Sequence, residues 1–159
     1  MGAIQKVYIL RGVSGSGKST FARTLSDNRV ILSSDDFWTL GGTDYKETFD
    51  FKKLGEAHAW NLRRYIDFLT GVMFVPGDFD IIVDNTNTTI AEIAPYYAVA
   101  QAFGVPTEII SLDTDPKVAF ERNVHGVPEA AHRRQTDNFR RNTSQIPSYW
   151  NHRIVHGNS

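Results

Sequence analysis

The sequence predicts an α/β domain, a three-layer sandwich in which a parallel sheet of about four or five strands lies between helices and a helical lid follows near the C-terminus. Apolar runs rich in β-branched residues, without polar alternation, indicate strands that are buried on both faces. Segments with helical spacing of apolar residues separate these runs, so strand and helix alternate along the chain. Because the chain has 159 residues and no internal repeat, we expect residues 1–159 to form one domain.

Four runs of apolar residues are the strand candidates. Each is short and followed by a segment with a different pattern, as a strand in a parallel sheet requires. The runs are KVYILR (6–11), RVILS (29–33), FDIIVD (79–84) and TEIISL (107–112).

The helix candidates lie between and after these strands. A Gly/Pro hinge at residues 124–128 precedes the last of them, and we therefore expect residues 115–142 to form a mobile lid. Residues 38–50 are the longest irregular segment, and the tail after Pro147 shows no usable pattern. The apolar stripes run over Phe21 and Leu25, from Leu54 to Leu69, from Ile90 to Ala98 and from Val118 to Phe120.

Composition excludes several classes of function. The chain has no cysteine, which removes disulfide-linked partners, thiolate metal sites and cysteine nucleophiles and fits a reducing cytosol. No apolar run approaches the roughly 18 residues of a membrane helix, and the first ten residues lack a secretory signal. We therefore expect a cytoplasmic protein with no membrane partner. Residues 116–159 carry seven Lys and Arg against three Asp and Glu, which indicates either a phosphate-attracting region or an ordinary solvated helix face.

The stretch RGVSGSGKST at residues 11–20 is the strongest functional signal. It matches G-x-x-x-x-G-K-[ST] between an apolar strand and an amphipathic helix, the setting of a P-loop. Backbone without bulky side chains lets successive amides surround a phosphate at the positive end of the helix. A glycine-rich turn without a ligand is the alternative. The residues expected to bind ATP are Gly12, Ser14, Gly15, Ser16, Gly17, Lys18, Ser19 and Thr20, with Lys18 on the β- and γ-phosphates and Ser19 on Mg²⁺.

Carboxylates follow the second and third strands, where parallel sheets bind ligands. In SSDDFW we expect Asp35 to act as the general base for an attacking hydroxyl, and Asp36 either to cap the next turn or to contact the acceptor. Both can instead be simple helix-start residues. In IIVDNTN we expect Asp84 to hold the metal or its water, with an Asx-turn as the alternative.

Arg122 lies where a predicted helix ends before the Gly/Pro hinge. An arginine on a lid can close over the γ-phosphate as charge develops there, so Arg122 is a candidate catalytic and ATP-binding residue. A surface ion pair is the alternative. The chain contains no Asn-Lys pair, and a GTPase with a guanine-binding Asn-Lys-x-Asp box is therefore disfavoured.

The chain resembles the kinase domain of the polynucleotide kinase family, which includes the phage 5′-hydroxyl kinase and eukaryotic relatives. The motifs LRGVSGSGKST, SSDDFW, LGEAHAWN, IIVDNTN and ERNVHGVP occur in the family's order over about residues 6–140. The resemblance implies transfer of the ATP γ-phosphate to a nucleic-acid hydroxyl, with Lys18 and Ser19 on ATP–Mg²⁺, Asp35 as base and Arg122 on the phosphates. Two positions depart from it: Trp38 replaces an arginine of the phage enzyme that grips the acceptor phosphate, and Arg140 replaces an acidic residue of eukaryotic relatives.

Trp38 is itself a candidate for acceptor binding, because an indole at the acceptor site can stack on a base. The alternative is an ordinary partly buried aromatic residue. A stacking Trp38 would also suit a phage DNA-modification kinase acting on hydroxymethyl pyrimidines such as 5-hydroxymethyluracil. A small-molecule kinase and a non-catalytic ATP-binding module also remain open. The candidate substrate-binding residues are Asp36, Trp38, Asn85, Asn87 and Arg134.

Overall fold

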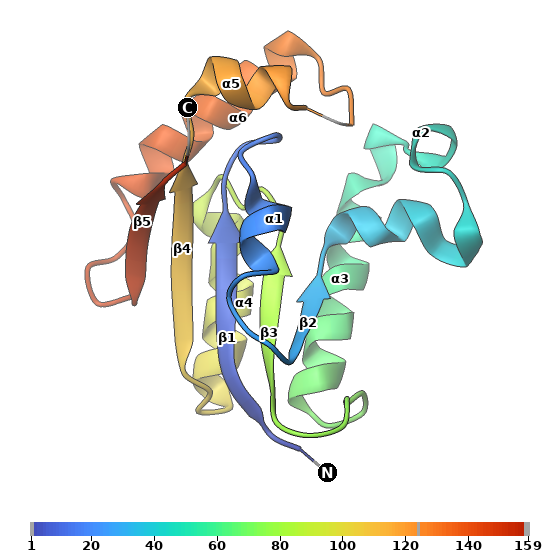
Figure 1. The fold of residues 1–159 in the computed structure, drawn as a ribbon, viewed down its shortest axis with the longest axis vertical. Helices are drawn as coiled ribbons and strands as arrows, with labels where there is room; N and C mark the ends of the chain where they lie inside the picture. The colour runs from blue at the N-terminus through green and yellow to red at the C-terminus, as the bar shows by residue number, and fades with distance from the viewer. Residues whose placement is uncertain (1, 124, 158–159) are drawn as a thin grey trace.

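A computed structural model describes residues 2–123 and 125–157 of the chain (Figure 1). Position 124 of the predicted hinge and both extreme ends of the predicted domain lie outside the described residues. The strands are β1 (Ile4–Arg11), β2 (Arg29–Leu32), β3 (Phe79–Asp84), β4 (Thr107–Asp113) and β5 (His152–His156). The α-helices are α1 (Lys18–Ala22), α2 (Tyr45–Thr48), α3 (Leu54–Leu69), α4 (Ile90–Ala102), α5 (Pro116–Glu121) and α6 (Glu129–Thr143), and two 3₁₀ segments are η1 (Ser34–Gly42) and η2 (Phe51–Lys53).

The sheet has five strands in the order β2-β3-β1-β4-β5, and every neighbouring pair is parallel. This confirms the predicted α/β class and its parallel sheet, and the strand order is that of a P-loop NTPase-like fold. All strands therefore end at one edge, where α5 and the segment from η1 to α2 lie on opposite sides of β1 (Figure 1). Ligand sites of such sheets lie at this edge.

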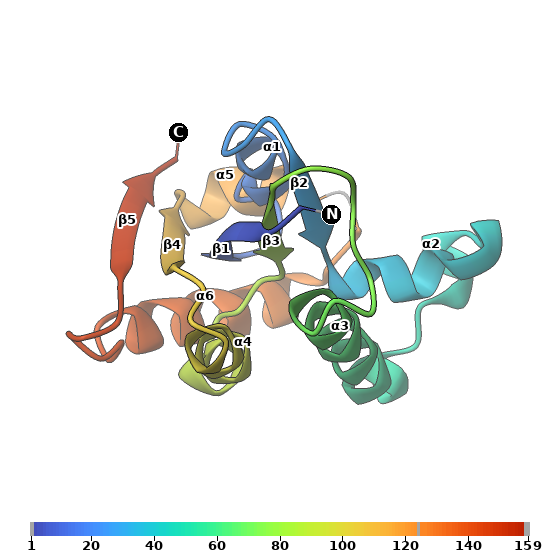
Figure 2. The same ribbon diagram turned by 90° about the horizontal axis from the view of Figure 1, so that it is seen from below.

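Side chains alternate between the two faces of the central strand. Val7 and Ile9 of β1 belong to the apolar core beneath α3 and α4, whereas Leu10 belongs to the core beneath α1. Figure 2 shows the three layers, with α3, α4 and α6 on one side of the sheet and α1 and α5 on the other. This two-sided burial explains why the strands read as unbroken apolar runs in the sequence.

The structure differs from the sequence-based expectation in two segments. The tail after Pro147, which showed no pattern, supplies β5 as an edge strand paired with β4 along His152–His156. The five residues of β5 are exposed or only partly buried, so few of them need to be apolar. Residues 38–50, expected to be irregular, are mostly η1 and α2.

The predicted lid helices are present as α5 and α6, and α6 is docked on the body of the domain. Phe139 of α6 packs with Val13 and Ala119 in a small apolar core beside the glycine-rich loop. Arg11, at the end of β1, is fully buried, and its guanidinium donates to Phe139 O at 3.2 Å and to Thr143 Oγ1. The C-terminal helix is therefore fastened directly to the strand that leads into the loop.

Candidate active site

The glycine-rich loop connects β1 to α1 and has the backbone of an anion cradle. Gly15 and Gly17 both adopt positive φ angles, 82° and 96°, which favour glycine. Gly17 caps α1 without a side-chain hydrogen bond, so the first amides of the helix stay available for a ligand. The Ser16 hydroxyl is buried and has no hydrogen-bond partner among the described residues. These features fit the phosphates of a nucleotide.

Gly15 is also where the loop touches α5. A Cβ atom at this position would overlap the carbonyl oxygen of Ala119, and it would lie 3.1 Å from the amide nitrogen of Asn123. The missing side chain thus serves two needs, the positive φ and the close approach of α5 to the loop.

Replacing Gly15 by alanine is expected to displace the loop and lower kcat/KM for ATP by about 10²-fold, since misplacement by about 1 Å costs that much. Gly104→Ala is the matched control, because Gly104 also has a positive φ (68°) but a Cβ atom added there would meet nothing within 4 Å among the described residues. Steady-state kinetics compare the two. Equal kinetic effects of both substitutions would contradict the importance of the α5 contact.

Lys18 and Ser19 begin α1 and face the end of β3. The Lys18 amine lies 3.4 Å from Val13 O, and burial lowers its pKa while the charges of Asp84 and Asp35 act to raise it. The Ser19 hydroxyl donates to Asp84 Oδ2 at 2.9 Å. A hydroxyl and a carboxylate oxygen side by side at the foot of a phosphate cradle are ligands that suit Mg²⁺. Asp84 therefore lies beside Ser19 at the glycine-rich loop, and its role as a metal ligand stays a prediction.

Asp35 lies in the first turn of η1, directly after β2. Ser33 caps this turn by accepting a hydrogen bond from the Asp35 amide at 3.2 Å. Burial raises the pKa of the Asp35 carboxyl, and the neighbouring charges of His125 and Lys18 partly oppose this shift. A carboxylate with a raised pKa, pointing into a cavity, is suited to accept a proton.

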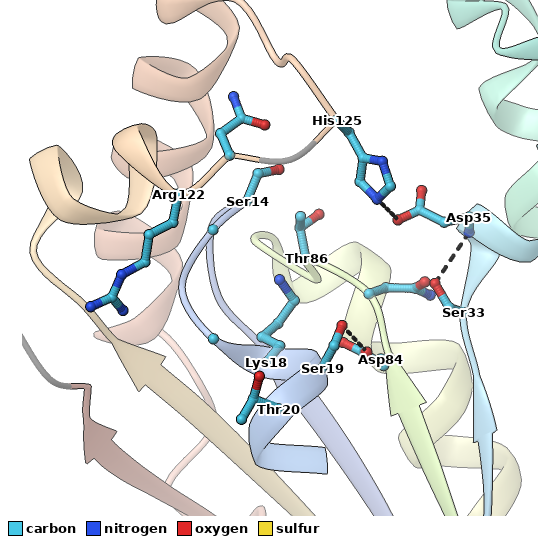
Figure 3. Close-up of a pocket in the computed structure, with 14 residues that line it drawn as sticks. Ser14, Lys18, Ser19, Thr20, Ser33, Asp35, Asp84, Thr86, Arg122 and His125 are labelled. Atoms are coloured by element: carbon cyan, nitrogen blue, oxygen red, sulfur yellow. Dashed lines mark hydrogen bonds and ion pairs between the residues drawn. The ribbon is translucent and has the colours of Figure 1, made fainter. Parts of the chain in front are cut away.

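Two cavities meet at Asp35. The first, of about 340 Å³, is lined by the glycine-rich loop, Lys18 and Arg122. The second, of about 380 Å³, extends beneath η1 toward Arg23 and Tyr45. Both are lined by Ser19, Ser33, Asp35, Asp84 and His125. Figure 3 shows Asp35 on the wall of the first cavity. The site therefore has room for two ligands that would touch one another beside the Asp35 carboxylate.

Helix α6 holds the loop from the opposite side. Gln135 Oε1 accepts a hydrogen bond from the Ser14 amide at 2.9 Å, and buried His132 contacts Ser14 O through Nε2 at 2.8 Å. With both backbone groups of Ser14 engaged, its amide is not free for a phosphate in this conformation. The Ser16 amide also donates to Val13 O at 3.0 Å, so the amides of Gly15 and of Gly17 to Ser19 are the ones left to form the cradle.

Arg122 lines the first cavity, as predicted, but it does not face Asp35. In Figure 3 its guanidinium points toward the Thr20 side of the loop, away from the carboxylate. The residue of the α5–α6 connection that does face Asp35 is His125, whose Nε2 lies 3.6 Å from Asp35 Oδ2. The expectation that Arg122 lies over the γ-phosphate therefore does not describe this conformation.

The structure places three of the candidate acceptor contacts away from the two cavities. Trp38 is 1% exposed and packs edge-on against Phe37 and Phe49, so its indole is a core residue and offers no face to a base. Asn87 is also buried, and its amide donates to Leu10 O at 2.8 Å in a structural role. Arg134 is exposed on α6 and lines neither of the two cavities.

The other two candidates lie at the site. Asp36 lines the second cavity and pairs with Arg64 at 3.1 Å, although Ser33 and not Asp36 is the cap of the turn. Asn85 lines the first cavity, and its Oδ1 accepts a hydrogen bond from the Ser34 amide at 2.8 Å, which ties β3 to the start of η1.

Sequence reasoning missed His125, His132 and Gln135. The ERNVHGVP motif contains His125, which could have been singled out as the one titratable side chain inside the hinge. No local sequence pattern predicts the contacts of His132 and Gln135 with Ser14, because the partners are 118 and 121 positions apart, respectively.

The fold and the site define a P-loop, kinase-like nucleotide-binding domain. The family model described as AAA domain matches residues 7–145, and the chain belongs to that family. It is 38% identical over 142 residues to NEDD4-binding protein 2 of Homo sapiens, an alignment that covers 85% of this chain and 8% of that protein.

Solved structures with the same fold include a chain of an RNA repair complex and a gluconokinase. A chain of the Pnkp1/Rnl/Hen1 RNA repair complex superimposes with a TM-score of 0.68 at 19% identity, over 92% of this chain and 48% of that one. A gluconokinase from Sinorhizobium meliloti 1021 gives a TM-score of 0.60 at 13% identity, over 99% and 85%. Within the described residues, none of the helices has the length and apolar character needed to cross a membrane.

Proposed function

We propose that this domain is an ATP-dependent kinase that transfers the γ-phosphate to a nucleic-acid hydroxyl, at the 5′-hydroxyl end of a polynucleotide. The observation that carries the proposal is the position of Asp35 on the wall shared by two cavities, one lined by the glycine-rich loop and one beneath η1. A nucleotide in the first cavity and an alcohol in the second would meet beside a carboxylate.

The nucleotide side uses residues of the loop and its surroundings. The amides of Gly15 and of Gly17 to Ser19 and the Lys18 amine bind the phosphates, and Arg122 binds the nucleotide toward the Thr20 side. Ser19 and Asp84 would hold Mg²⁺, which neutralises phosphate charge when bound. Positioning and charge neutralisation supply most of the rate in such reactions.

The acceptor side uses Asp35. Its carboxylate orients the hydroxyl and takes its proton as the acceptor oxygen bonds to the γ-phosphorus and the bond from that phosphorus to the β-phosphate oxygen breaks, which releases ADP. The charge of Lys18, which acts to lower the pKa of Asp35, stabilises the negative charge on the phosphoryl group during transfer.

Three observations favour a nucleic-acid acceptor. Four of the five motifs that resemble polynucleotide kinases lie at the site, in the loop, η1, the end of β3 and the α5–α6 connection, and the fifth, LGEAHAWN, lies in α3. A chain of an RNA repair complex shares the fold. The second cavity also has Arg23 at its edge, and an exposed guanidinium can meet a phosphate of the acceptor strand.

The other candidate acceptors have less support. The case for hydroxymethyl pyrimidines used base stacking on Trp38, and burial of that indole removes it. A small-molecule kinase has the fold likeness to a gluconokinase in its favour, at 13% identity. Both are therefore included as alternatives in the test.

The test supplies labelled ATP with one acceptor at a time: a 5′-hydroxyl oligonucleotide, a 5′-blocked DNA containing 5-hydroxymethyluracil, and gluconate. We expect label on the first acceptor and none with Lys18→Ala. Label on the blocked DNA or on gluconate alone would overturn the choice of acceptor. Absence of label on every acceptor, with nucleotide still bound, would favour a non-catalytic ATP-binding module.

A further inference from the structure

His125 is presented to the site by a hydrogen-bonded loop. The Asn123 side chain donates to Val127 O at 2.7 Å and accepts from the Val127 amide at 3.1 Å. The Asn123 amide group thus closes the loop that carries His125. Gly126 completes the turn with a φ of 68°. This arrangement limits where the imidazole can point, and it points at Asp35 (Figure 3).

The imidazole is also the end of a stack of rings. Its plane lies 24° from that of Tyr45, with ring centroids 4.1 Å apart, and Tyr45 stacks in turn on Phe49 at 5.5 Å. Phe49 packs edge-on against buried Trp38. Asp44 fixes the position of Tyr45 by capping α2, because its carboxylate accepts from the Lys46 amide at 2.8 Å. The stack therefore connects His125 to the core beneath η1.

Tyr45 and His125 flank Asp35 together. Tyr45 and Asp35 line the second cavity together, and burial, with the charge of Asp35, raises the pKa of the Tyr45 hydroxyl. The Asp35 side chain is 54% exposed, so without these neighbours its carboxylate would have several rotamers available. The backbone of Asp35 therefore does not fix the direction of its carboxylate, and neighbouring side chains must do so.

We propose that His125 is a positioning residue for Asp35, held against it by the Tyr45 stack so that the carboxylate stays between the nucleotide and acceptor cavities. This inference rests on the proposed kinase function, in which Asp35 must face the acceptor hydroxyl. His125 lines both cavities and reaches the site from the α5–α6 connection, whereas Asp35 and Tyr45 come from the segment after β2. The contact between His125 and Asp35 therefore joins the α5–α6 connection to the segment after β2.

Little stability is expected from the contact itself. Exposed ion pairs contribute about 0–1 kcal/mol, and a distance of 3.6 Å between Nε2 and Oδ2 is too long for a strong hydrogen bond. A purely structural role would therefore leave activity and stability almost unchanged on substitution. A positioning role would lower turnover while the protein stays folded.

The experiment measures transfer of labelled phosphate to a 5′-hydroxyl oligonucleotide by the full chain carrying His125→Ala. We expect kcat to fall by about 10–10²-fold with little change in the Kd for nucleotide, since orientation and not nucleotide binding is lost. Added imidazole should restore part of kcat in His125→Ala, and should restore less when Tyr45→Leu is also present, because the stacking surface is then gone. His156→Ala is the matched control, because His156 forms a similar pair with Asp113 at 3.5 Å on β5.

The outcomes separate the two proposals. A wild-type protein that labels no nucleic acid overturns the proposed function. A wild type that labels the oligonucleotide, together with a His125→Ala variant that keeps its kcat or is not rescued by imidazole, overturns the role of His125. NMR of the free protein tests the contact without any acceptor: the His125 ring protons should be shifted by the Tyr45 ring and return in Tyr45→Leu, and unshifted signals in wild type overturn the inference.

Discussion

Replacing Asp35 by asparagine is expected to slow phosphate transfer by about 10²–10⁴-fold while leaving ATP binding nearly intact, because the amide cannot take the proton of the acceptor hydroxyl. The residue lies on the wall common to both cavities and makes no direct hydrogen bond to Lys18 among the described residues. Single-turnover transfer from labelled ATP and equilibrium binding of a fluorescent ATP analogue measure the two quantities separately.

The folded state disfavours the Asp35 charge, since burial raises the pKa of its carboxyl above the ordinary value. Because the Asp35 side chain is 54% exposed, the effect of its charge on stability is small, and Asp35→Asn is expected to leave Tm nearly unchanged or slightly raised. Asp27→Asn, at an exposed aspartate in the turn before β2, is the matched control and should retain full turnover. Full turnover in Asp35→Asn would show that Asp35 is not the base.

The pH dependence of wild-type turnover offers a second measure of the same role. A general base works only when it is deprotonated, so turnover should fall as the pH decreases through the pKa of Asp35, at a pH above the ordinary range for aspartate. The acidic limb of the profile should disappear in the residual activity of Asp35→Asn. An acidic limb that persists unchanged in that variant would assign it to another group.

Replacing Arg11 by methionine is expected to lower the free energy of unfolding by about 3–5 kcal/mol, because several buried acceptors lose their donor at once. The guanidinium donates to Asn87 O at 3.0 Å, Thr88 O at 3.0 Å and Ser111 Oγ at 2.9 Å, besides its two contacts with α6. It also lies over the Phe139 ring at 4.4 Å. Burial lowers the pKa of Arg11 to about 10, so the group stays charged at neutral pH.

Chemical denaturation of Arg11→Met compared with wild type measures this effect. Arg63→Met is the control, because Arg63 is exposed on α3 and surface substitutions change stability by about 0.5 kcal/mol or less. Arg11→Lys should also destabilise the domain, since an ammonium cannot reach the same set of acceptors. If Arg11→Met unfolds at the same denaturant concentration as Arg63→Met, the buried arginine does not hold α6 to the sheet.

The class of fold and the position of the nucleotide loop could be predicted because both leave a local signal. Strands buried on both faces must be apolar throughout, which identified β1, β2, β3 and β4. A phosphate cradle needs glycines at fixed spacing before a helix, which identified Gly15, Gly17 and their neighbours. Asp35 and Asp84 were found because residues that directly follow parallel strands must lie at the same edge of the sheet.

Other parts of the site were decided by contacts between distant segments. The direction in which Trp38 points depends on Phe49 and the rest of η1 and α2, and the structure places the indole in the core instead of the acceptor site. Helix α6 lies against the loop through contacts with Arg11, Val13 and Ser14, which are distant in the sequence. His125 contacts Asp35 from the α5–α6 connection.

By itself, then, the sequence determined the layered α/β architecture, the glycine-rich loop and the two aspartates after β2 and β3. The tertiary structure decided which aromatic ring faces the site, which residue of the α5–α6 connection accompanies Asp35, and that the tail becomes β5. The physical reason is that periodicity and motif spacing depend on the burial and backbone geometry of a residue's own strand or loop. Pairing between residues such as His125 and Asp35, 90 positions apart, leaves no such pattern along the chain.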